Sequence, residues 1–351
     1  MGTITTCFRL LERKYNMNLG RMSHTYSTIV LCTILMITVA QAQAPDYDPF
    51  ITEHEKDSLA TAEYPYIFPL FGKNVARKGV DLPLPVGISI NYYQQSMGVI
   101  IDRVSLGLGN DQLIPLAFVA FEDVNNKANN YNARLDLWLF PFLNIYGIAG
   151  YAQADANVIL NAPFEFETKV DFSGWTYGVG AVLAFGLQGF WATTDGNLAW
   201  TNMEDYYDPV RATVLSFRLG RRLPIKKLQN FNIWLGAMYL NPESTVNGRF
   251  LLADIISDEL SGQFEDYYLS DWYNALSPEE QQFIDGFVQT MMQGGADTRL
   301  DYQAEQHPEN AWNMIAGAGF ELSKRWFLEV EAGFLGSRTS LMLNMNYRLP
   351  L

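Results

Sequence analysis

The sequence predicts an all-β chain that folds as a transmembrane, antiparallel, up-and-down β-barrel. Three observations predict this fold: a leader at the amino end, alternation of apolar with small or polar residues from Val86 onward, and alternation that continues to the last residue. The composition agrees, because 48% of the 351 residues are hydrophobic and only 18% are charged, which excludes a disordered acidic polymer. The net charge of −14 leaves no basic field for phosphate backbones, so nucleic acid is not an expected partner.

The first 42 residues have the pattern of a secretory signal peptide. Four basic residues precede a short apolar run at 29–39, and a small-residue cleavage site ends at Ala42. The alternative is a membrane-anchoring helix, but the run is too short to cross about 30 Å of hydrocarbon. Both cysteines, Cys7 and Cys32, lie in this leader, so cleavage after Ala42 leaves a mature chain without a thiol or a disulfide.

The alternation from Val86 onward has the period of a β-strand. Tyr131, Leu135 and Leu137 occupy one parity of a typical segment, and Arg134 and Asp136 take the other. Segments of this kind predict ten strands, near residues 86–97, 129–140, 143–154, 173–185, 188–201, 209–220, 229–240, 310–322, 325–335 and 339–350. Residues 99–122 are ambiguous, and two further strands there would make twelve.

A soluble sandwich would alternate in the same way, but it would carry many lysines on its outer face. Lysine is scarce in these segments, and the polar face carries glycines with isolated charges. In a transmembrane barrel the apolar face meets lipid, and strands of about 9–11 residues suffice. Aromatic residues near the segment ends, such as Trp175, Trp312 and Trp326, fit the aromatic belts at the two membrane interfaces. The pattern therefore favours the membrane barrel.

Apolar residues occupy every second position of the carboxyl end, from Leu341 to Leu351, and the other parity includes Ser340, Asn344, Asn346 and Arg348. This segment resembles the closing strand and assembly signal of bacterial outer-membrane barrels, which usually end in Phe where this chain has Pro350 and Leu351. The resemblance implies insertion by the barrel-assembly machinery. It also implies that outer-membrane lipid and lipopolysaccharide surround the protein.

Four further segments carry a broader resemblance, namely 82–93, 136–147, 176–181 and 336–340. They resemble an uncharacterised family of bacterial outer-membrane β-barrel proteins. The resemblance implies the fold and a location in the bacterial outer membrane. It implies no activity and no cofactor.

We expect three regions: a signal peptide at 1–42, a periplasmic arm or a strap inside the barrel mouth at 43–83, and the barrel at 84–351. An even number of strands brings both ends of the barrel to the periplasm, with the short turns. The long acidic connection 241–309 then faces outside. Within it, Ser277 and Glu280 form a capping box that begins an amphipathic helix.

Strand parity turns a set of charged side chains toward the lumen. They are Arg134, Asp136, Asp195, Arg218, Glu321, Glu329, Glu331 and Arg348. Charges at membrane depth need a partner or water, so two interpretations remain open. Ion pairs would close the barrel and make it a structural or surface scaffold. A water-filled lumen would make it a narrow channel for a small solute, and the inward glycines at 178, 180, 317 and 319 would make room for it.

An enzymatic alternative is a hydrolase at the outer rim around His307, with Asp301 or Glu305 to orient the imidazole. No serine-centred motif accompanies this histidine, and His54 falls in a charged, solvated arm. The acidic loop has no match to a twelve-residue calcium loop, so no metal site is assigned. We therefore expect a protein that is not an enzyme.

Overall fold

The computed structural model describes residues 64–78, 80–108, 112–116, 120–162, 166–187, 189–226, 229–251, 267–292 and 298–350. The predicted signal peptide at 1–42, His54 and the first part of the predicted arm lie outside these residues. Across the described residues, no helix has the length and apolar character needed to cross a membrane.

The strands are β1 (Val86–Leu108), β2 (Ile114–Pro115), β3 (Ala120–Phe140), β4 (Leu143–Ala162), β5 (Phe166–Leu187), β6 (Phe190–Met203), β7 (Val210–Lys226), β8 (Gln229–Pro242), β9 (Thr245–Leu251), β10 (Arg299–Pro308), β11 (Trp312–Glu321), β12 (Trp326–Phe334) and β13 (Arg338–Leu349). The helical segments are α4 (Gly72–Ala76), η3 (Tyr267–Leu269), α6 (Asp271–Asn274) and α7 (Pro278–Met292).

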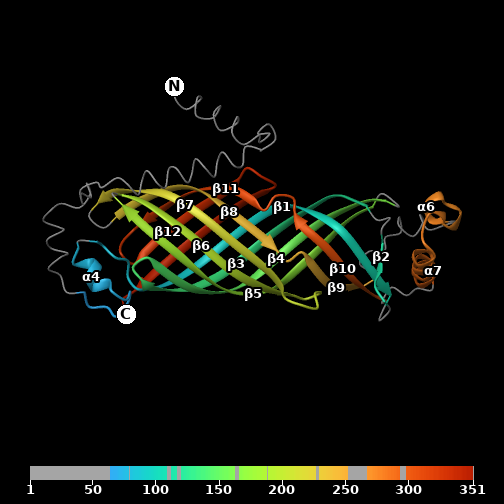
Figure 1. Cartoon of the computed structure of the whole chain (residues 1–351), viewed down its shortest axis with the longest axis horizontal. Coiled ribbons are helices and arrows are strands. Elements are labelled where there is room, and N and C mark those ends of the chain that lie inside the picture. Colours follow the sequence, from blue (N-terminus) through green and yellow to red (C-terminus); the bar gives the residue numbers. More distant parts are fainter. Residues whose placement is uncertain are drawn as a thin grey trace, which may run out of the picture. The chain divides into compact units, whose positions relative to one another are not determined.

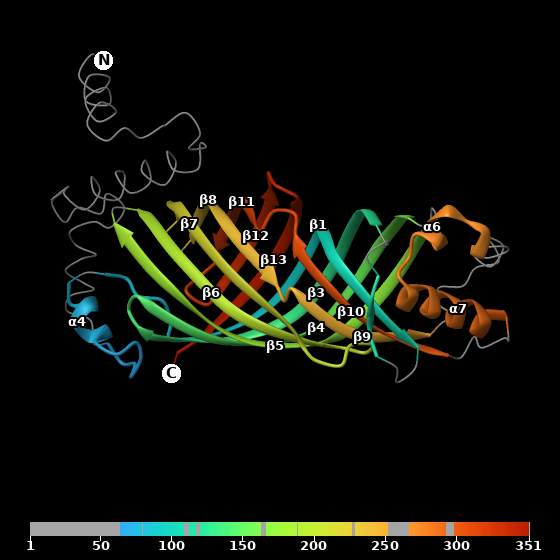
Figure 2. The ribbon, with the colours of Figure 1, turned by 45° about the vertical axis from the view of Figure 1, so that its right-hand side comes forward.

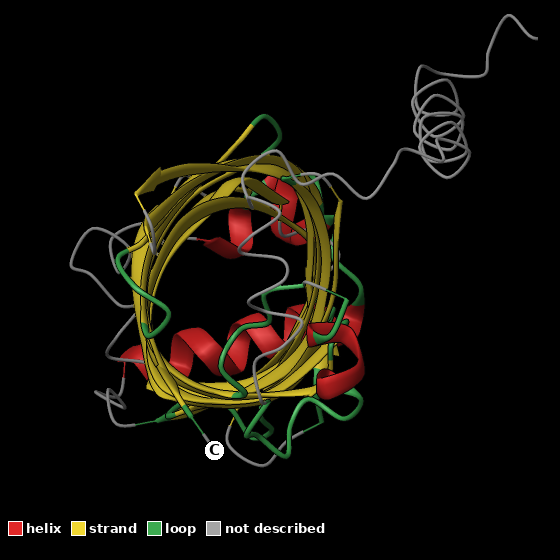
Figure 3. Cartoon of the chain, turned by 90° about the vertical axis from the view of Figure 1, so that its left-hand side faces the viewer, coloured by secondary structure: helices red, strands yellow, loops and turns green. Residues whose placement is uncertain are grey.

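Ten strands of the described chain close into an antiparallel barrel in the order β13, β12, β11, β8, β7, β6, β5, β4, β3 and β1 (Figures 1 and 3). Pairing of β1 with β13, from Val86 opposite Leu349 to Met97 opposite Arg338, closes the ring. The predicted ten-stranded barrel is confirmed, and the alternative of twelve is wrong. The ambiguous residues 99–122 instead lengthen β1 and β3 and supply the two-residue β2.

The apolar parity of the strands faces outward. Trp175 is 69% exposed and Leu135 is 60% exposed, whereas Asp136 and Ser89, on the opposite parity, are each 2% exposed. Large apolar side chains in water would be unfavourable all around the ring, but they suit a surface that meets lipid. The soluble sandwich is excluded for the same reason.

The barrel has two different ends. The end that carries the short turns is called the inner end, and the opposite end is called the outer end. The short turns join β3 to β4, β5 to β6, β7 to β8, and β11 to β12. The chain before β1 lies at the inner end, where the Leu70 N–H donates to the Leu139 carbonyl at 2.9 Å. The Lys324 ammonium also bonds the carboxylate of Asp81 there, at 2.8 Å.

The outer end is extended by long strands. β1, β3, β4 and β5 have 20 to 23 residues, whereas β12 has only 9. Beyond the first residue of β13, β10 replaces β13 as the neighbour of β1. The Gly98 N–H still donates to the Ser337 carbonyl, and the next residue, Val99, pairs with Pro308 of β10. β9 pairs with β10. The connection 241–309 therefore contributes wall strands as well as a loop.

Helix α7 packs at the outer end (Figure 2). Its capping box is formed, since the Ser277 N–H donates to the Glu280 carboxylate at 2.8 Å and the Glu280 N–H to the Ser277 hydroxyl at 3.3 Å. The buried side chains Phe283, Ile284 and Val288 pack with Leu116 and Leu300 in a small apolar cluster. Because Leu300 has the inward parity of β10, this cluster lies on the inner face of the extension.

Candidate functional site

The eight charges predicted for the lumen all lie on the inward parity of their strands, and the structure brings six of them together in pairs. The pairs are Arg134 with Asp195, Asp136 with Arg348, and Arg218 with Glu331. Glu321 pairs instead with Arg222. Glu329 lies near these groups but makes no hydrogen bond to another described side chain.

The pair of Arg218 and Glu331 is buried inside the barrel. The Arg218 guanidinium donates through Nε at 2.6 Å and through Nη2 at 2.8 Å to the two carboxylate oxygens of Glu331. The Trp234 indole N–H donates to the same carboxylate at 2.6 Å, and Arg218 Nη1 donates to the Ser216 hydroxyl at 2.7 Å. A two-point pair of this kind is strong and geometrically specific.

Asp136 organises a second cluster. Its carboxylate accepts from Arg348 at 2.9 Å and from the Asn144 amide at 2.6 Å. Gly87 lies against this carboxylate, which leaves no room there for a Cβ atom. The Arg348 guanidinium also donates to the Leu84 carbonyl at 2.9 Å, so the cluster joins the barrel to the chain that precedes β1.

Asp195 organises a third cluster, with Arg134 at 3.7 Å and the Tyr146 hydroxyl donating at 2.6 Å. The Arg134 guanidinium lies 3.5 Å from the centre of the Tyr146 ring, which is a cation–π arrangement. At the inner end, Glu321 accepts from Arg222 at 2.7 Å and from the Asn230 amide at 2.7 Å.

Three of the four inward glycines predicted to leave a bore are instead covered by aromatic rings, and the fourth, Gly178, lies against the Leu198 carbonyl and Ala199. A Cβ atom on Gly180 would collide with the Tyr146 ring, and one on Gly317 would collide with the Trp234 ring. The Trp234 and Phe327 rings both lie over Gly319. At Gly180, Gly317 and Gly319, the space that a Cβ atom would need is taken by neighbouring aromatic side chains.

The sequence interpretation missed two inward charges, Arg222, which pairs with Glu321, and Arg338. Arg338 is the more deeply buried of the two. It is fully buried, and its Nη2 donates to the Asn313 amide oxygen at 2.5 Å and to the Met238 carbonyl at 3.2 Å. Within the described chain, its Nε and Nη1 have no hydrogen-bond partner. The signal was available, because Arg338 has the same parity as Ser340 and Arg348.

His307 lies outside the lumen, on the outward parity of β10. Its Nδ1 is 2.8 Å from the carboxylate of Asp102, and the two side chains are 48% and 52% exposed. The expectation that Asp301 or Glu305 orients this histidine is wrong. Glu305 pairs with Arg103 at 3.4 Å, and Asp301 hydrogen-bonds Tyr207.

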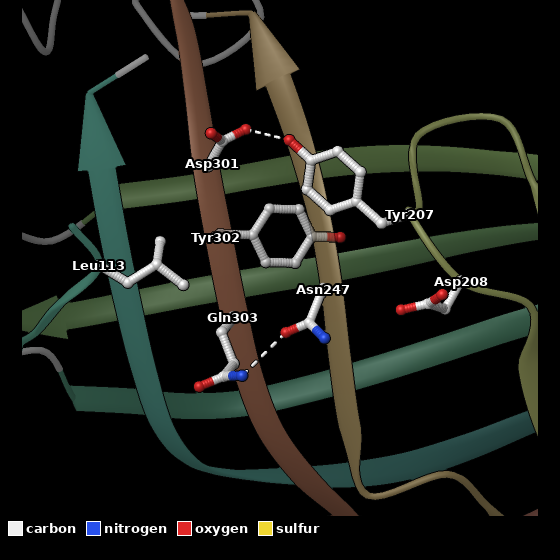
Figure 4. Close-up of a pocket in the computed structure, with 7 residues that line it drawn as sticks. All are labelled: Leu113, Tyr207, Asp208, Asn247, Asp301, Tyr302 and Gln303. Carbon is white, nitrogen blue, oxygen red and sulfur yellow. Dashed lines mark hydrogen bonds between the residues drawn. The ribbon is translucent and has the colours of Figure 1, made fainter. Parts of the chain in front are cut away.

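A hollow of about 440 Å³ lies beside these residues in the outer extension (Figure 4). Its lining residues are Leu113, Tyr207, Asp208, Asn247, Asp301, Tyr302 and Gln303. The Gln303 amide donates to the Asn247 amide oxygen at 2.9 Å, and the hydrogen bond to Asp301 raises the pKa of Tyr207. The polar side chains of this hollow therefore hold one another in place.

No group of three or more His, Cys, Asp or Glu side chains in the described residues is arranged to hold a metal ion. Much of the acidic loop considered for calcium, including Asp254, Asp258 and Glu265, lies outside those residues.

No protein-family model matches the chain, and no curated protein matches it. Solved structures do match at low identity. The β domain of the Bordetella autotransporter BrkA is 12% identical with a TM-score of 0.35, and the match covers 77% of this chain and 100% of that one. OprG of Pseudomonas aeruginosa is 9% identical with a TM-score of 0.35, over 76% and 98%. The transport unit of the autotransporter AIDA-I of Escherichia coli is 10% identical with a TM-score of 0.34, over 86% and 100%.

The closed ring, the apolar outer surface and the polar interior define the class. The chain is a ten-stranded transmembrane β-barrel of the outer-membrane type. Membership of the uncharacterised family that the sequence resembles stays a prediction.

Proposed function

We propose that this protein is a non-enzymatic outer-membrane barrel whose lumen is closed and whose outer extension forms a scaffold at the cell surface. The observation that carries the proposal is the set of ion pairs that join strands which are not neighbours in the wall. Arg218 on β7 reaches Glu331 on β12, and Arg134 on β3 reaches Asp195 on β6. Each pair bridges two intervening strands on the inner face of the wall, and aromatic rings cover Gly180, Gly317 and Gly319 on that face.

Both ends of the lumen support the same proposal. At the outer end, α7 packs against the inner face of the extension. At the inner end, the Arg348 guanidinium is bonded both to Asp136 and to the Leu84 carbonyl of the preceding chain. A solute would have to displace each of these layers in turn.

Planar-bilayer conductance tests the closed lumen. We expect long silent recordings from the wild-type protein. Trp234→Ala, which empties the space above Gly317 and Gly319, should show discrete openings. Frequent channels in the wild-type protein, altered by Arg218→Ala, would contradict the proposal and favour the channel for small solutes.

The narrow channel remains the second candidate because of Glu329. This carboxylate lies close to the Arg218 pair and has no hydrogen bond to another described side chain, so a charged Glu329 needs water. If water crosses the whole lumen, the lining charges are Arg134, Asp136, Asp195, Arg218, Glu329 and Glu331. Glu329→Gln should then change ion selectivity, whereas a closed barrel would show no effect.

The location is part of the proposal. We expect the inner end in the periplasm and the outer extension outside the cell, with lipopolysaccharide around the extension and the barrel-assembly machinery as the insertion partner. Membrane fractionation combined with amino-terminal sequencing tests this, and a mature chain that begins at Gln43 is the expected result. An intact Met1 in the cytoplasmic fraction would contradict it.

A further inference from the structure

The chain at the inner end contains a short basic stretch between Glu63 and Asp81. Residues 64–80, which we call the inner arm, contain Lys73, Arg77 and Lys78 but no Asp or Glu, in a protein of net charge −14. All three cations are exposed, and none of them makes an ion pair with another described residue. Cations of this kind remain available to a negatively charged partner.

The inner arm also exposes large apolar side chains. Ile67 is 77% exposed, Phe71 is 68% exposed and Leu70 is 39% exposed. These exposed fractions match those of the lipid-facing strands, although the inner arm is not a barrel strand. Apolar anchors next to unpaired cations are typical of segments that lie in a membrane interface.

Aromatic stacking connects this patch with the lipid-facing surface. The Phe71 ring lies 6.2 Å from the Phe140 ring, which lies 5.6 Å from the Phe142 ring in the turn between β3 and β4. The hydrogen bond from Leu70 to Leu139 holds the inner arm at the same place. The exposed side chains therefore continue the apolar belt of the barrel at its inner edge.

We propose that the inner arm is a membrane-surface anchor for anionic phospholipid. Ile67, Leu70 and Phe71 enter the leaflet beside the barrel, and Lys73, Arg77 and Lys78 hold headgroup phosphates. Continuity with the lipid-facing belt favours phospholipid over a soluble acidic protein as the partner. The proposal rests on the transmembrane fold and is independent of whether the lumen is closed.

The cations should set the strength of the anchor. Each Lys or Arg near an anionic surface favours the bound state about fivefold, so three together favour it on the order of 100-fold. The effect should weaken in 1 M salt, because the Debye length there is only about 3 Å. The apolar side chains should add binding that salt does not remove.

The test uses the full-length barrel in lipid vesicles, with Cys7→Ser and Cys32→Ser to remove the native thiols. A polarity-sensitive dye on Ile67→Cys reports contact with lipid through quenching by brominated acyl chains. Vesicles of phosphatidylcholine are compared with vesicles that also contain phosphatidylglycerol. Both leaflets have the same composition, so the direction of insertion does not affect the result.

We expect strong quenching with phosphatidylglycerol and much less without it. The triple variant Lys73→Gln, Arg77→Gln, Lys78→Gln should lower the ratio of bound to free arm on the order of 100-fold. Arg299→Gln, an exposed arginine at the outer end, is the charge control and should have no effect. A dye on Leu269→Cys, 68% exposed in η3 at the outer end, should stay unquenched.

Three results would overturn the proposal: no quenching at position 67, equal quenching in the two lipids, or no loss in the triple variant. Heat-modifiable gel mobility checks that each variant still forms the barrel. If the triple variant does not fold, salt titration of the protein labelled at position 67 replaces it, and insensitivity to salt counts against the proposal. Protection of position 67 in cells but not in anionic vesicles would identify another macromolecule and would also overturn it.

Discussion

Arg218 and Glu331 form a two-point ion pair across the lumen, although β8 and β11 separate their strands in the barrel wall. Glu331 is 3% exposed, so its charge depends on Arg218 and on the Trp234 indole for compensation. If the lumen is closed as we propose, the same two residues both stabilise the barrel and block its interior.

Removing one partner of this pair should destabilise the barrel more than removing both. Arg218→Ala or Glu331→Ala leaves a buried charge uncompensated, which costs about 3–5 kcal/mol, and the double variant should cost less than the sum of the two. Urea unfolding in vesicles, followed by tryptophan fluorescence, measures these differences. Arg103→Ala is the matched control, because its pair with Glu305 is exposed and contributes about 1 kcal/mol or less. Additive losses for Arg218 and Glu331 would contradict the cross-lumen pair.

The Trp234 ring should make Gly317 intolerant of a side chain. Gly317→Ala overpacks this site and should cost about 1–3 kcal/mol in the same unfolding assay. In the Trp234→Ala background the same substitution should cost clearly less. Gly147→Ala is the control, since its added Cβ would meet only the Gly178 carbonyl at 3.9 Å. Equal losses in the two backgrounds would show that Trp234 does not fill this space.

Alkaline pH should release α7 from the segment before it. Asp285 accepts from the Tyr267 hydroxyl at 2.7 Å and from the Tyr273 hydroxyl at 2.8 Å. Burial, and then the bond to Asp285, raises the pKa of Tyr267 to about 12, and the bond to Asp285 is the main cause that raises the pKa of Tyr273. The fold thus favours the neutral tyrosines.

Because these pKa values are raised, the contribution to stability is complete below about pH 10, the ordinary pKa of tyrosine, and is lost as the pH rises through 12. The mobility of a spin label on Leu269→Cys should increase over this interval. In Asp285→Ala, the label should be mobile already at neutral pH, and tyrosinate absorbance should appear at lower pH. A label whose mobility does not change between pH 8 and pH 12 would contradict this prediction.

His307 should be dispensable. Its contact with Asp102 is about half exposed, so His307→Ala and Asp102→Ala should each change the free energy of unfolding by about 1 kcal/mol or less. Assays with ester and peptide substrates should show no hydrolysis by the wild-type protein or by either variant. Hydrolysis that disappears in His307→Ala would establish the rim hydrolase and refute the non-enzymatic proposal.

The sequence by itself determined the barrel, its ten strands and most of their inner ends; β7 continues to Lys226, six residues past its predicted end. Its period of two indicates which residues of a strand face lipid and which face the lumen, and this sorting is local to each strand. For this reason Phe140 and Leu143 bound the same turn in the sequence interpretation and in the structure. The eight charges assigned from parity lie on the inward parity of their strands. Arg338 was missed because the predicted strand began one residue later, and Arg222 because the predicted strand ended at residue 220.

Only the tertiary structure decided which residues meet across the barrel. Arg218 and Glu331 are 113 positions apart, and Asp102 and His307 are 205 apart. Their contacts depend on the curvature and stagger of the closed sheet, which no local period encodes. The course of β10 has a similar origin. β13 begins opposite Met97, so the backbone of β1 beyond Met97 is free to pair with a strand from the outer connection.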